Sequence, residues 1–288
     1  MEQLELSEIQ GFLVKNYMEM PFSNYYLLEI KNAGKAKIFL KEIAKEITSV
    51  SANQNDFYLN IGFTAAGLSA LGLHEKNLRS FIREFREGMV TPHRQRLLGD
   101  HESSDPEKWA WGGPANQPVH LILMIFASTE ENFLSYHEDL LKKLDQNELK
   151  LVHILKADVF PDNKEHFGFR ESISQPSIIG SGVEGLERDK IKAGEFILGY
   201  RNEYDVHPDT PLIKEAQGNL NMLPFDPEGT EQKDLGRNGT YFVLRQLKED
   251  VDGLWNFLNE KTRNEDGSLN PAESTKLAAK MMGRWPSG

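Results

Sequence analysis

The stretch that decides the fold runs from residue 56 to residue 63 and reads DFYLNIGF. Phe57, Leu59, Ile61 and Phe63 alternate with other residues, which is typical of a strand that buries one face. Thr64 follows directly and predicts the N-cap of a short helix that ends near residue 72. This pattern indicates a sheet with one face covered by helices.

Further segments of the first half extend this pattern in both directions. Alternation and branched or aromatic residues predict strands over Tyr25–Ile30, Val119–Ala127 and Leu149–Val159. Apolar residues at helical spacing predict one helix over Lys35–Thr48 and another that opens at the S-x-x-E capping box of Ser128 and Glu131. The order β-α-β-β-α-β predicts a ferredoxin-like α+β fold, in which helices lie on one face of an antiparallel sheet.

The connections between these elements are less regular. A helix is predicted over Glu75–Gly88, and a long polar connection over Val90–Pro118 is of the kind that usually has a function. After an irregular region, a strand is predicted over Thr240–Leu247 and a helix over Lys248–Leu258. Asn270 and Pro271 predict the start of a last helix that runs to residue 282.

This late strand and its helices allow two interpretations. The first is a duplicated ferredoxin-like fold whose second repeat is incomplete in this chain. The second is a single domain with an added strand and two helices. We adopt the first, with a ferredoxin-like domain at 1–160, a connecting region at 161–238 and the start of a second domain at 239–288. A lone first strand has two unpaired edges, so residues 240–285 are predicted to be the least stable part of the chain.

Composition excludes several classes of function. The net charge of −11 argues against binding to nucleic acid and to anionic membranes. The chain has no cysteine, which excludes disulfides and thiolate metal sites. The acidic N-terminal residues lack the pattern of a secretory signal, and the longest apolar run, Val119–Ala127, is too short to span a bilayer. We therefore expect a cytoplasmic protein with no membrane or nucleic-acid partner.

The residues that suggest chemistry lie in the loop HFGFRESISQP, residues 166–176. Gly168 permits an unusual backbone conformation, and Arg170 and Glu171 place a cation beside a carboxylate. A partly buried carboxylate with such neighbours can act as a proton shuttle. A charged pair that is simply solvated at the surface is the alternative that these residues leave open.

This loop resembles the G-x-x-D-G signature of dye-decolorizing peroxidases in its F-G-F-x-D-G-I-S-Q-P form. Other segments are similar to the same family, in the same order and along the whole chain. They are Ile9–Gly11, Phe63–Leu73, Glu84–Met89, Leu98–Asp100, Gly194–Tyr200, Leu235–Tyr241, Arg245–Leu247 and Gly283–Gly288.

The resemblance implies two ferredoxin-like halves and a peroxidase that uses haem b. In the family, a histidine of the second half binds the iron, an aspartate of the signature loop moves a proton, and an arginine stabilises developing charge. Carried onto this chain, the resemblance makes Glu171 the catalytic carboxylate. It implies cofactor binding by Gly168, Phe169, Arg170, Ser172, Ile173, Ser174 and Gln175.

The chain departs from the family pattern at the signature. Glu171 replaces the aspartate and Ser172 replaces the following glycine. The extra methylene shifts the carboxylate by about 1.5 Å, and a misplacement of that size can lower a rate on the order of a hundredfold. The family's iron histidine and arginine belong beyond the region matched here, so no metal ligand is predicted. For His166 a loop hydrogen bond is the favoured role.

The function that the resemblance implies is oxidation of dyes, phenolics or similar small aromatic donors by hydrogen peroxide. Two alternatives remain. The chain is a non-catalytic member of the family that acts as a binding or assembly module, or it is one half of a split enzyme. A second chain or a homo-oligomer would then complete the second domain, and the isolated chain is predicted not to bind haem stoichiometrically.

Overall fold

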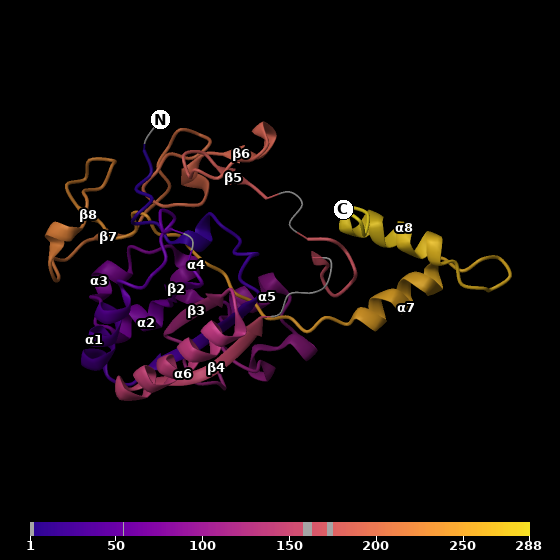
Figure 1. The fold of residues 1–288 in the computed structure, drawn as a ribbon, viewed down its shortest axis with the longest axis horizontal. Helices are drawn as coiled ribbons and strands as arrows, with labels where there is room; N and C mark the ends of the chain where they lie inside the picture. The colour runs from indigo at the N-terminus through magenta and orange to yellow at the C-terminus, as the bar shows by residue number, and fades with distance from the viewer. Residues whose placement is uncertain (1–2, 54, 158–162, 172–174) are drawn as a thin grey trace. The chain divides into compact units, whose positions relative to one another are not determined.

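The computed structural model describes residues 3–53, 55–157, 163–171 and 175–288. Its main sheet contains four antiparallel strands in the order β2-β3-β1-β4 (Figure 1). All four strands predicted in the first half are confirmed, although residues 158 and 159 of the last prediction lie outside the described residues. The strands are β1 (Phe22–Ile30), β2 (Phe57–Phe63), β3 (Leu121–Ala127) and β4 (Leu149–Ala157).

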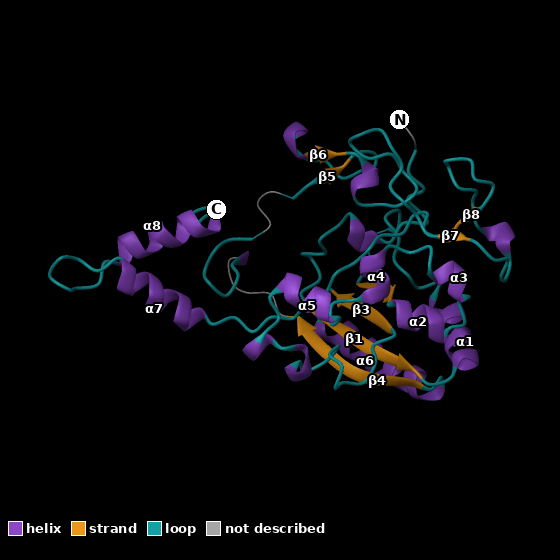
Figure 2. Ribbon diagram, turned by 180° about the vertical axis from the view of Figure 1, so that it is seen from behind, coloured by secondary structure: helices purple, strands orange, loops and turns teal. Residues whose placement is uncertain are grey.

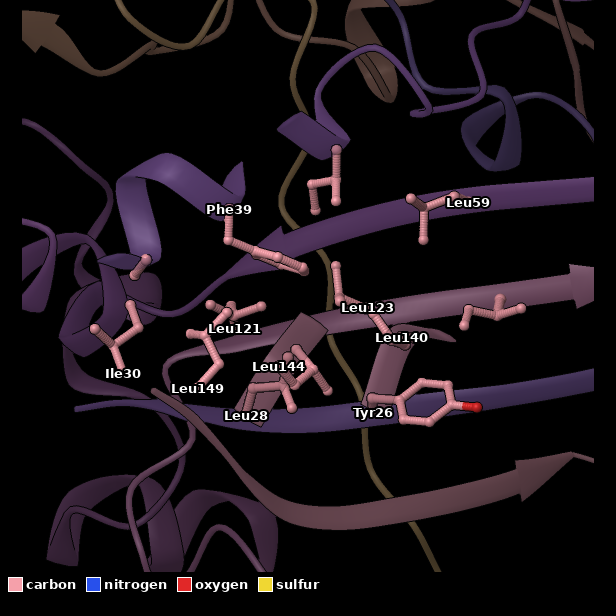
Figure 3. Packing of buried hydrophobic residues seen from close by; sticks show 13 residues of the cluster. Tyr26, Leu28, Ile30, Phe39, Leu59, Leu121, Leu123, Leu140, Leu144 and Leu149 are labelled. Atoms are coloured by element: carbon pink, nitrogen blue, oxygen red, sulfur yellow. The ribbon is translucent and has the colours of Figure 1, made fainter. Parts of the chain in front are cut away.

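Two helices pack on the same face of this sheet, α1 (Ala33–Ile43) and α6 (Glu130–Gln146) (Figure 2). Phe39 of α1 and Leu140 of α6 lie with Leu123 of β3 in one buried cluster (Figure 3). This arrangement confirms the ferredoxin-like α+β class. The thirteen buried residues of the cluster are Tyr26, Leu28, Ile30, Ala36, Phe39, Ile43, Leu59, Leu121, Leu123, Ile125, Leu140, Leu144 and Leu149.

The start of α6 corrects one prediction. Thr129 is the N-cap, and its hydroxyl accepts a hydrogen bond from the Asn132 N–H at 3.2 Å. The hydroxyl of Ser128, the predicted cap, instead donates to the Asp56 carboxylate at 2.9 Å. Both residue types cap helices well, so two such neighbours leave the first helical residue undecided in the sequence. The predicted cap at Thr64 is confirmed, because its hydroxyl accepts from the Gly67 N–H at 3.0 Å.

The connection between β2 and β3 holds four short helices. They are α2 (Ala65–Ala70), α3 (Glu75–Leu78), α4 (Arg83–Glu87) and α5 (Pro92–Leu98). The single helix predicted over residues 75–88 is wrong, because it is interrupted between α3 and α4. The Ser80 hydroxyl donates to the Asn77 carbonyl at 2.6 Å, and such a local bond competes with continuation of a helix.

Residues 177–242 contain only short elements, in agreement with the irregular region expected there. β5 (Ser177–Ile178) pairs in parallel with β6 (Lys190–Ile191), and β7 (Leu212–Ile213) pairs antiparallel with β8 (Lys233–Asp234).

Short 3-10 helices are distributed along the described chain, at Gly11–Leu13, Glu102–Ser104, Pro106–Lys108, Glu187–Asp189, Ala193–Glu195 and Leu220–Met222.

The chain divides into two compact units. Unit 1 comprises residues 1–158 and 177–242, and unit 2 comprises residues 159–176 and 243–288. The signature loop therefore groups with the C-terminal helices, whereas the sequence placed it in a connecting region. The difference arises because residues distant in sequence pack together, which local patterns do not record.

Unit 2 is built on a helical hairpin of α7 (Val251–Lys261) and α8 (Pro271–Met282). The start predicted at Asn270 is confirmed, since its side chain accepts from the Glu273 N–H at 3.2 Å. The strand predicted over Thr240–Leu247 is wrong, because these residues form no strand. A strand requires a pairing partner, and no described segment pairs with them.

Within the ranges that the structure describes, no helix combines the length and the apolar character needed to cross a membrane.

Candidate functional site

The signature segment folds into a short hairpin, which we call the signature hairpin and define as residues 163–171. The Glu165 N–H donates to the Phe169 carbonyl at 2.9 Å, and the Gly168 N–H donates to the Glu165 carbonyl at 2.9 Å. Gly168 has φ of +91°, a conformation that favours glycine. A three-residue connection closed by such a glycine is common in hairpins.

The side chain of Glu165 closes the same hairpin. Its Oε1 accepts a hydrogen bond from the Phe169 N–H at 2.7 Å, and its Oε2 accepts one from the Phe167 N–H at 2.6 Å. Hydrogen bonds to a carboxylate are stronger than those between neutral groups. Glu165 was not among the residues predicted from the sequence. Its only signal was a glutamate three positions before a glycine, which one sequence cannot distinguish from a solvated charge.

Three contacts attach the hairpin to the helical part of unit 2. Phe169 is fully buried in a cluster with Leu258, Ala278 and Ala279. The Arg170 N–H donates to the Pro286 carbonyl at 3.2 Å. His166 Nδ1 lies 3.0 Å from the carboxylate of Glu249.

The residues predicted to form the site have different environments. Arg170, Glu171 and Gln175 are exposed, whereas Phe169 is buried. The backbone of Glu171 is held by its N–H, which donates to the Asn163 carbonyl at 2.8 Å. The hairpin thus brings the predicted residues Gly168 to Glu171 together. The predicted residues Ser172, Ile173 and Ser174 lie outside the described residues.

The hairpin therefore holds the backbone of two consecutive charged residues, Arg170 and Glu171, whose side chains are both exposed. A carboxylate in such a position can transfer a proton, and a guanidinium can stabilise negative charge. In the described parts of the chain, no three His, Asp or Glu side chains gather as ligands for a metal ion.

Two other segments that resemble the family determine the architecture of unit 1. Gln10 pairs with the edge of β2, because its side-chain amide accepts from the Ile61 N–H and donates to the Ile61 carbonyl, both at 2.9 Å. Gly67 packs against the chain before β3. A Cβ atom at Gly67 would lie 1.8 Å from the His120 carbonyl oxygen.

The segments Gly194–Tyr200 and Leu235–Tyr241 meet around Glu5. Its carboxylate accepts hydrogen bonds from Arg237 at 2.8 Å and from Asn238 at 2.7 Å. These bonds hold the pKa of Glu5 below its usual value. The Arg237 guanidinium also lies 4.7 Å from the centre of the Tyr200 ring. This cluster ties the N-terminal segment to two distant loops.

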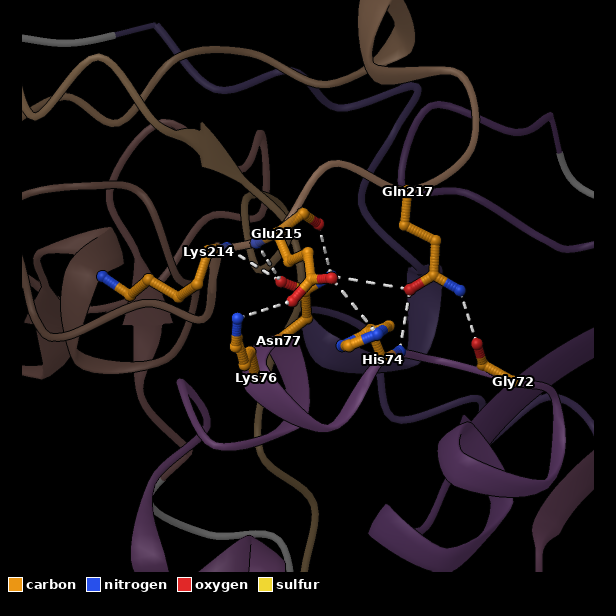
Figure 4. Close-up of polar contacts among 7 residues, drawn as sticks. All are labelled: Gly72, His74, Lys76, Asn77, Lys214, Glu215 and Gln217. Atoms are coloured by element: carbon orange, nitrogen blue, oxygen red, sulfur yellow. Dashed lines mark hydrogen bonds and ion pairs between the residues drawn. The ribbon is translucent and has the colours of Figure 1, made fainter.

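A further polar network joins residues 214–217 to α3 (Figure 4). The fully buried Asn77 accepts from the Lys214 and Glu215 N–H groups, both at 2.8 Å, and donates to the Glu215 carbonyl at 2.9 Å. The Glu215 carboxylate contacts Lys76 at 3.0 Å and His74 at 3.3 Å. Lys76 and His74 lower the pKa of Glu215. These bonds have a structural role, because they join two segments of unit 1.

A groove in unit 1 lies beside α1, α6 and the start of β2, and none of the predicted site residues lines it. The rings of Phe57 and Tyr136 lie in contact there, tilted by 32° with centres 3.8 Å apart. The Tyr136 hydroxyl donates to Glu46 at 2.8 Å, and burial, together with this glutamate, raises the pKa of Tyr136. The groove is distinct in composition from the signature hairpin, because it lacks an arginine beside its carboxylates.

Residues 8–161 match the family model described as the DyP dimeric alpha+beta barrel domain. A dye-decolorizing peroxidase of Mycetinis scorodonius is 24% identical over 99% of this chain and 51% of its own length. One from Exidia glandulosa is 24% identical over 99% of this chain and 52% of its own length. The chain thus spans about half the length of these relatives.

Solved structures share the fold. A crystal structure of a decolorizing peroxidase from Auricularia auricula-judae aligns with a TM-score of 0.72 at 22% identity, over 98% of this chain and 57% of that chain. A dye-decolorizing peroxidase in complex with 2,6-dimethoxyphenol aligns with a TM-score of 0.72 at 20% identity, over 98% of this chain and 59% of that chain.

Proposed function

Because this chain belongs to the dye-decolorizing peroxidase family, we propose that it contributes to the oxidation of small aromatic donors by hydrogen peroxide. Dyes and phenolics are the expected donors, since relatives are named for dye decolorization and one related structure contains 2,6-dimethoxyphenol. The observation that carries the proposal is the exposed Glu171 carboxylate, which follows Arg170 on the backbone-fixed signature hairpin.

Haem b, when bound, supplies the iron at which peroxide reacts. The carboxylate of Glu171 takes a proton from one peroxide oxygen and returns it to the other. Arg170 and Ser172, on either side of Glu171 in the sequence, are proposed to tune this carboxylate and to contact the cofactor. Gly168 keeps the hairpin tight, and Phe169 fixes it to the helices of unit 2. Ser172, Ile173, Ser174 and Gln175 are proposed to contact the cofactor because they continue the same loop.

We propose in addition that a second polypeptide, or another copy of this chain, completes the active protein. Unit 2 exposes several large apolar side chains, and Phe257, Met281 and Trp285 are each at least 50% exposed. We propose that these side chains gather in one patch, because contiguous exposed apolar surface marks interaction sites. On this proposal 239–288 belong to the second ferredoxin-like domain.

Absorption spectroscopy tests the proposed cofactor. Addition of haem to the full chain, alone and with a candidate second half, is expected to give a Soret band of a histidine-bound haem only when the second half is present. A tight one-to-one histidine complex of the chain alone would contradict the need for a partner. Sedimentation measurements on the same samples report which assembly forms.

Replacement of the carboxylate tests the proposed chemistry. In the haem-loaded protein, Glu171→Gln should slow the reaction with peroxide by about 10²- to 10⁴-fold while haem remains bound. Glu184→Gln removes the same charge from an exposed position outside the hairpin and should leave the rate unchanged. An unaltered rate in Glu171→Gln would remove Glu171 from the mechanism.

The exposed apolar side chains also support a second candidate function, that of a non-catalytic assembly module. This function predicts a stable complex without a haem spectrum, which the same titration detects.

We propose a cytoplasmic location, because a chain without cysteine is suited to a reducing compartment.

A further inference from the structure

We infer that Glu165 is a positioning residue, which sets the conformation of the signature hairpin and thereby the location of Glu171. The inference deepens the proposed function and rests on the role proposed there for Glu171. Glu165 does not contact the reacting atoms in this scheme. It acts through the backbone of the residues that follow it.

The first support is the geometry at the tip of the hairpin. The N–H groups of Phe167 and Phe169 both donate to the Glu165 side chain, one to each carboxylate oxygen. Both distances, 2.6 and 2.7 Å, are short for N–H···O bonds. Loss of this one side chain therefore leaves two backbone donors without a protein acceptor.

The second support is that the backbone of Glu165 is part of the same structure. Its N–H donates to the Phe169 carbonyl, and its carbonyl accepts from the Gly168 N–H. The residue thus makes four hydrogen bonds to the three residues Phe167, Gly168 and Phe169. It fixes the curvature of the tip from both its main chain and its side chain.

The third support is the path from the tip to Glu171. Phe169 is anchored in the buried cluster of unit 2, and Arg170 bonds to the Pro286 carbonyl. Lys164 and Arg170 are bridge partners, and the Glu171 N–H reaches the Asn163 carbonyl. If the tip opens, the two strands of the hairpin can separate. The hydrogen bond from the Glu171 N–H to the Asn163 carbonyl then loses the support of the closed tip. A shift of about 1 Å in a catalytic group can lower a rate about a hundredfold.

The direct test is amide hydrogen exchange by NMR on the full chain without haem. Glu165→Ala should accelerate exchange at Phe167 and Phe169 by about tenfold or more, because two charge-assisted bonds are lost. Glu165→Gln keeps one carbonyl oxygen and should accelerate exchange mainly at one of the two amides. Glu265→Gln, at an exposed position of unit 2, is the matched control and should change neither.

Exchange in α7 and α8 reports whether unit 2 remains folded in each variant. If Glu165→Ala unfolds unit 2, the test rests on Glu165→Gln, which should accelerate exchange at one of the Phe167 and Phe169 amides. Unchanged exchange at both amides in Glu165→Gln and Glu165→Ala would overturn the inference. An equal change in Glu265→Gln would also overturn it, since the effect would then be one of overall charge.

Reaction with peroxide in the haem-loaded protein separates this inference from the proposed function. Glu165→Ala should slow the reaction, and Glu165→Asp should restore part of the rate. If Glu165→Ala opens the hairpin while Glu171→Gln has no effect on the rate, the proposed function fails and the contact geometry stands. If Glu171→Gln slows the reaction while Glu165→Ala opens the hairpin without slowing it, the positioning role fails.

Discussion

The two units of this chain differ in how much apolar core supports them. Unit 1 has a cluster of thirteen buried residues between the sheet and two helices, whereas the cluster in unit 2 has four, Phe169, Leu258, Ala278 and Ala279. Segments with few buried contacts open at low free energy. The proposed catalytic carboxylate therefore lies on the less stable unit, and its position depends on a few anchors.

The residues that resemble the family also differ between the two units. In unit 1, Gln10, Gly67 and Arg237 have structural contacts, and a change there alters the scaffold. In unit 2, Arg170 and Glu171 are exposed and contribute little packing. Their exposure is also the environment of a solvated surface pair, so the peroxide reaction of Glu171→Gln decides between the two interpretations.

The largest expected effects come from truncation of one core residue in each unit. Leu123→Ala should lower the free energy of unfolding of unit 1 by about 2–5 kcal/mol, and Phe169→Ala that of unit 2 by about 3–5 kcal/mol. Because unit 2 has the smaller core, Phe169→Ala should abolish exchange protection in the signature hairpin, α7 and α8, while β1 to β4 stay protected. Segment-resolved hydrogen exchange measures both.

The exposed Leu269 of unit 2 supplies the control. Leu269→Ala should change stability by less than about 0.5 kcal/mol. Equal loss of protection across both units in Phe169→Ala would contradict the comparison, because it would show that the units unfold together.

A smaller loss of stability is expected at Gly67, a position of unit 1 where an added Cβ atom does not fit. Gly67→Ala places a methyl group against the His120 carbonyl and should cost about 1–3 kcal/mol as an overpacked site. Gly34→Ala, in α1, is the matched control. Its nearest neighbour would be the Asn32 side chain at 3.3 Å, and alanine favours a helix over glycine by about 1 kcal/mol. Denaturant titration should separate the two variants in opposite directions, and similar losses would contradict the steric argument.

The next largest loss of stability is expected at the N-terminus of α6. Thr129→Ala should cost about 1 kcal/mol, since it removes the N-cap. Ser128→Ala removes only an exposed bond to Asp56 and should cost less. Thermal unfolding of the two variants ranks them, and a greater loss in Ser128→Ala would restore the capping box that the sequence suggested.

Alternation and helical spacing were sufficient to predict the sheet and the two helices of unit 1, because those patterns arise directly from burial of one face. They failed for Thr240–Leu247, whose threonine, tyrosine, phenylalanine and valine suit a strand but have no strand to pair with. They also failed at Glu75–Gly88, where the helix is interrupted and the Ser80 hydroxyl donates to the Asn77 carbonyl.

For the candidate site, the sequence located the loop and its carboxylate but not the residues that hold them. The anchors of Phe169 lie about ninety or more positions later in the chain, and His166 and Glu249 are separated by about eighty. Glu165 has the composition of an ordinary surface residue. Its importance follows only from the direction of two backbone N–H groups, which depends on the positive φ of Gly168.

The smallest expected effect is a dependence of stability on pH that arises in unit 1. Nδ1 of His120 accepts a hydrogen bond from the Ile30 N–H at 3.0 Å, so the ring nitrogen must be unprotonated there. Burial lowers the pKa of His120; the Glu29 carboxylate opposes the shift and Lys31 adds to it. In the unfolded chain the pKa returns to about 6.5. Below that pH the unfolded state binds more protons than the folded state, so stability falls as the pH decreases through this range.

The effect should be smaller than loss of the helix cap, because the ring is only partly buried and solvent screens its charge. Denaturant titrations from pH 7.5 to pH 5 measure it. His120→Asn retains a side-chain oxygen that can accept from Ile30 but does not titrate, so it should remove this component of the pH dependence, whereas replacement of the exposed His101 by Asn should not. If the His120 variant keeps the full slope, the acid sensitivity comes from elsewhere, and the partly buried ring is no more than a neutral hydrogen-bond acceptor at the end of β1.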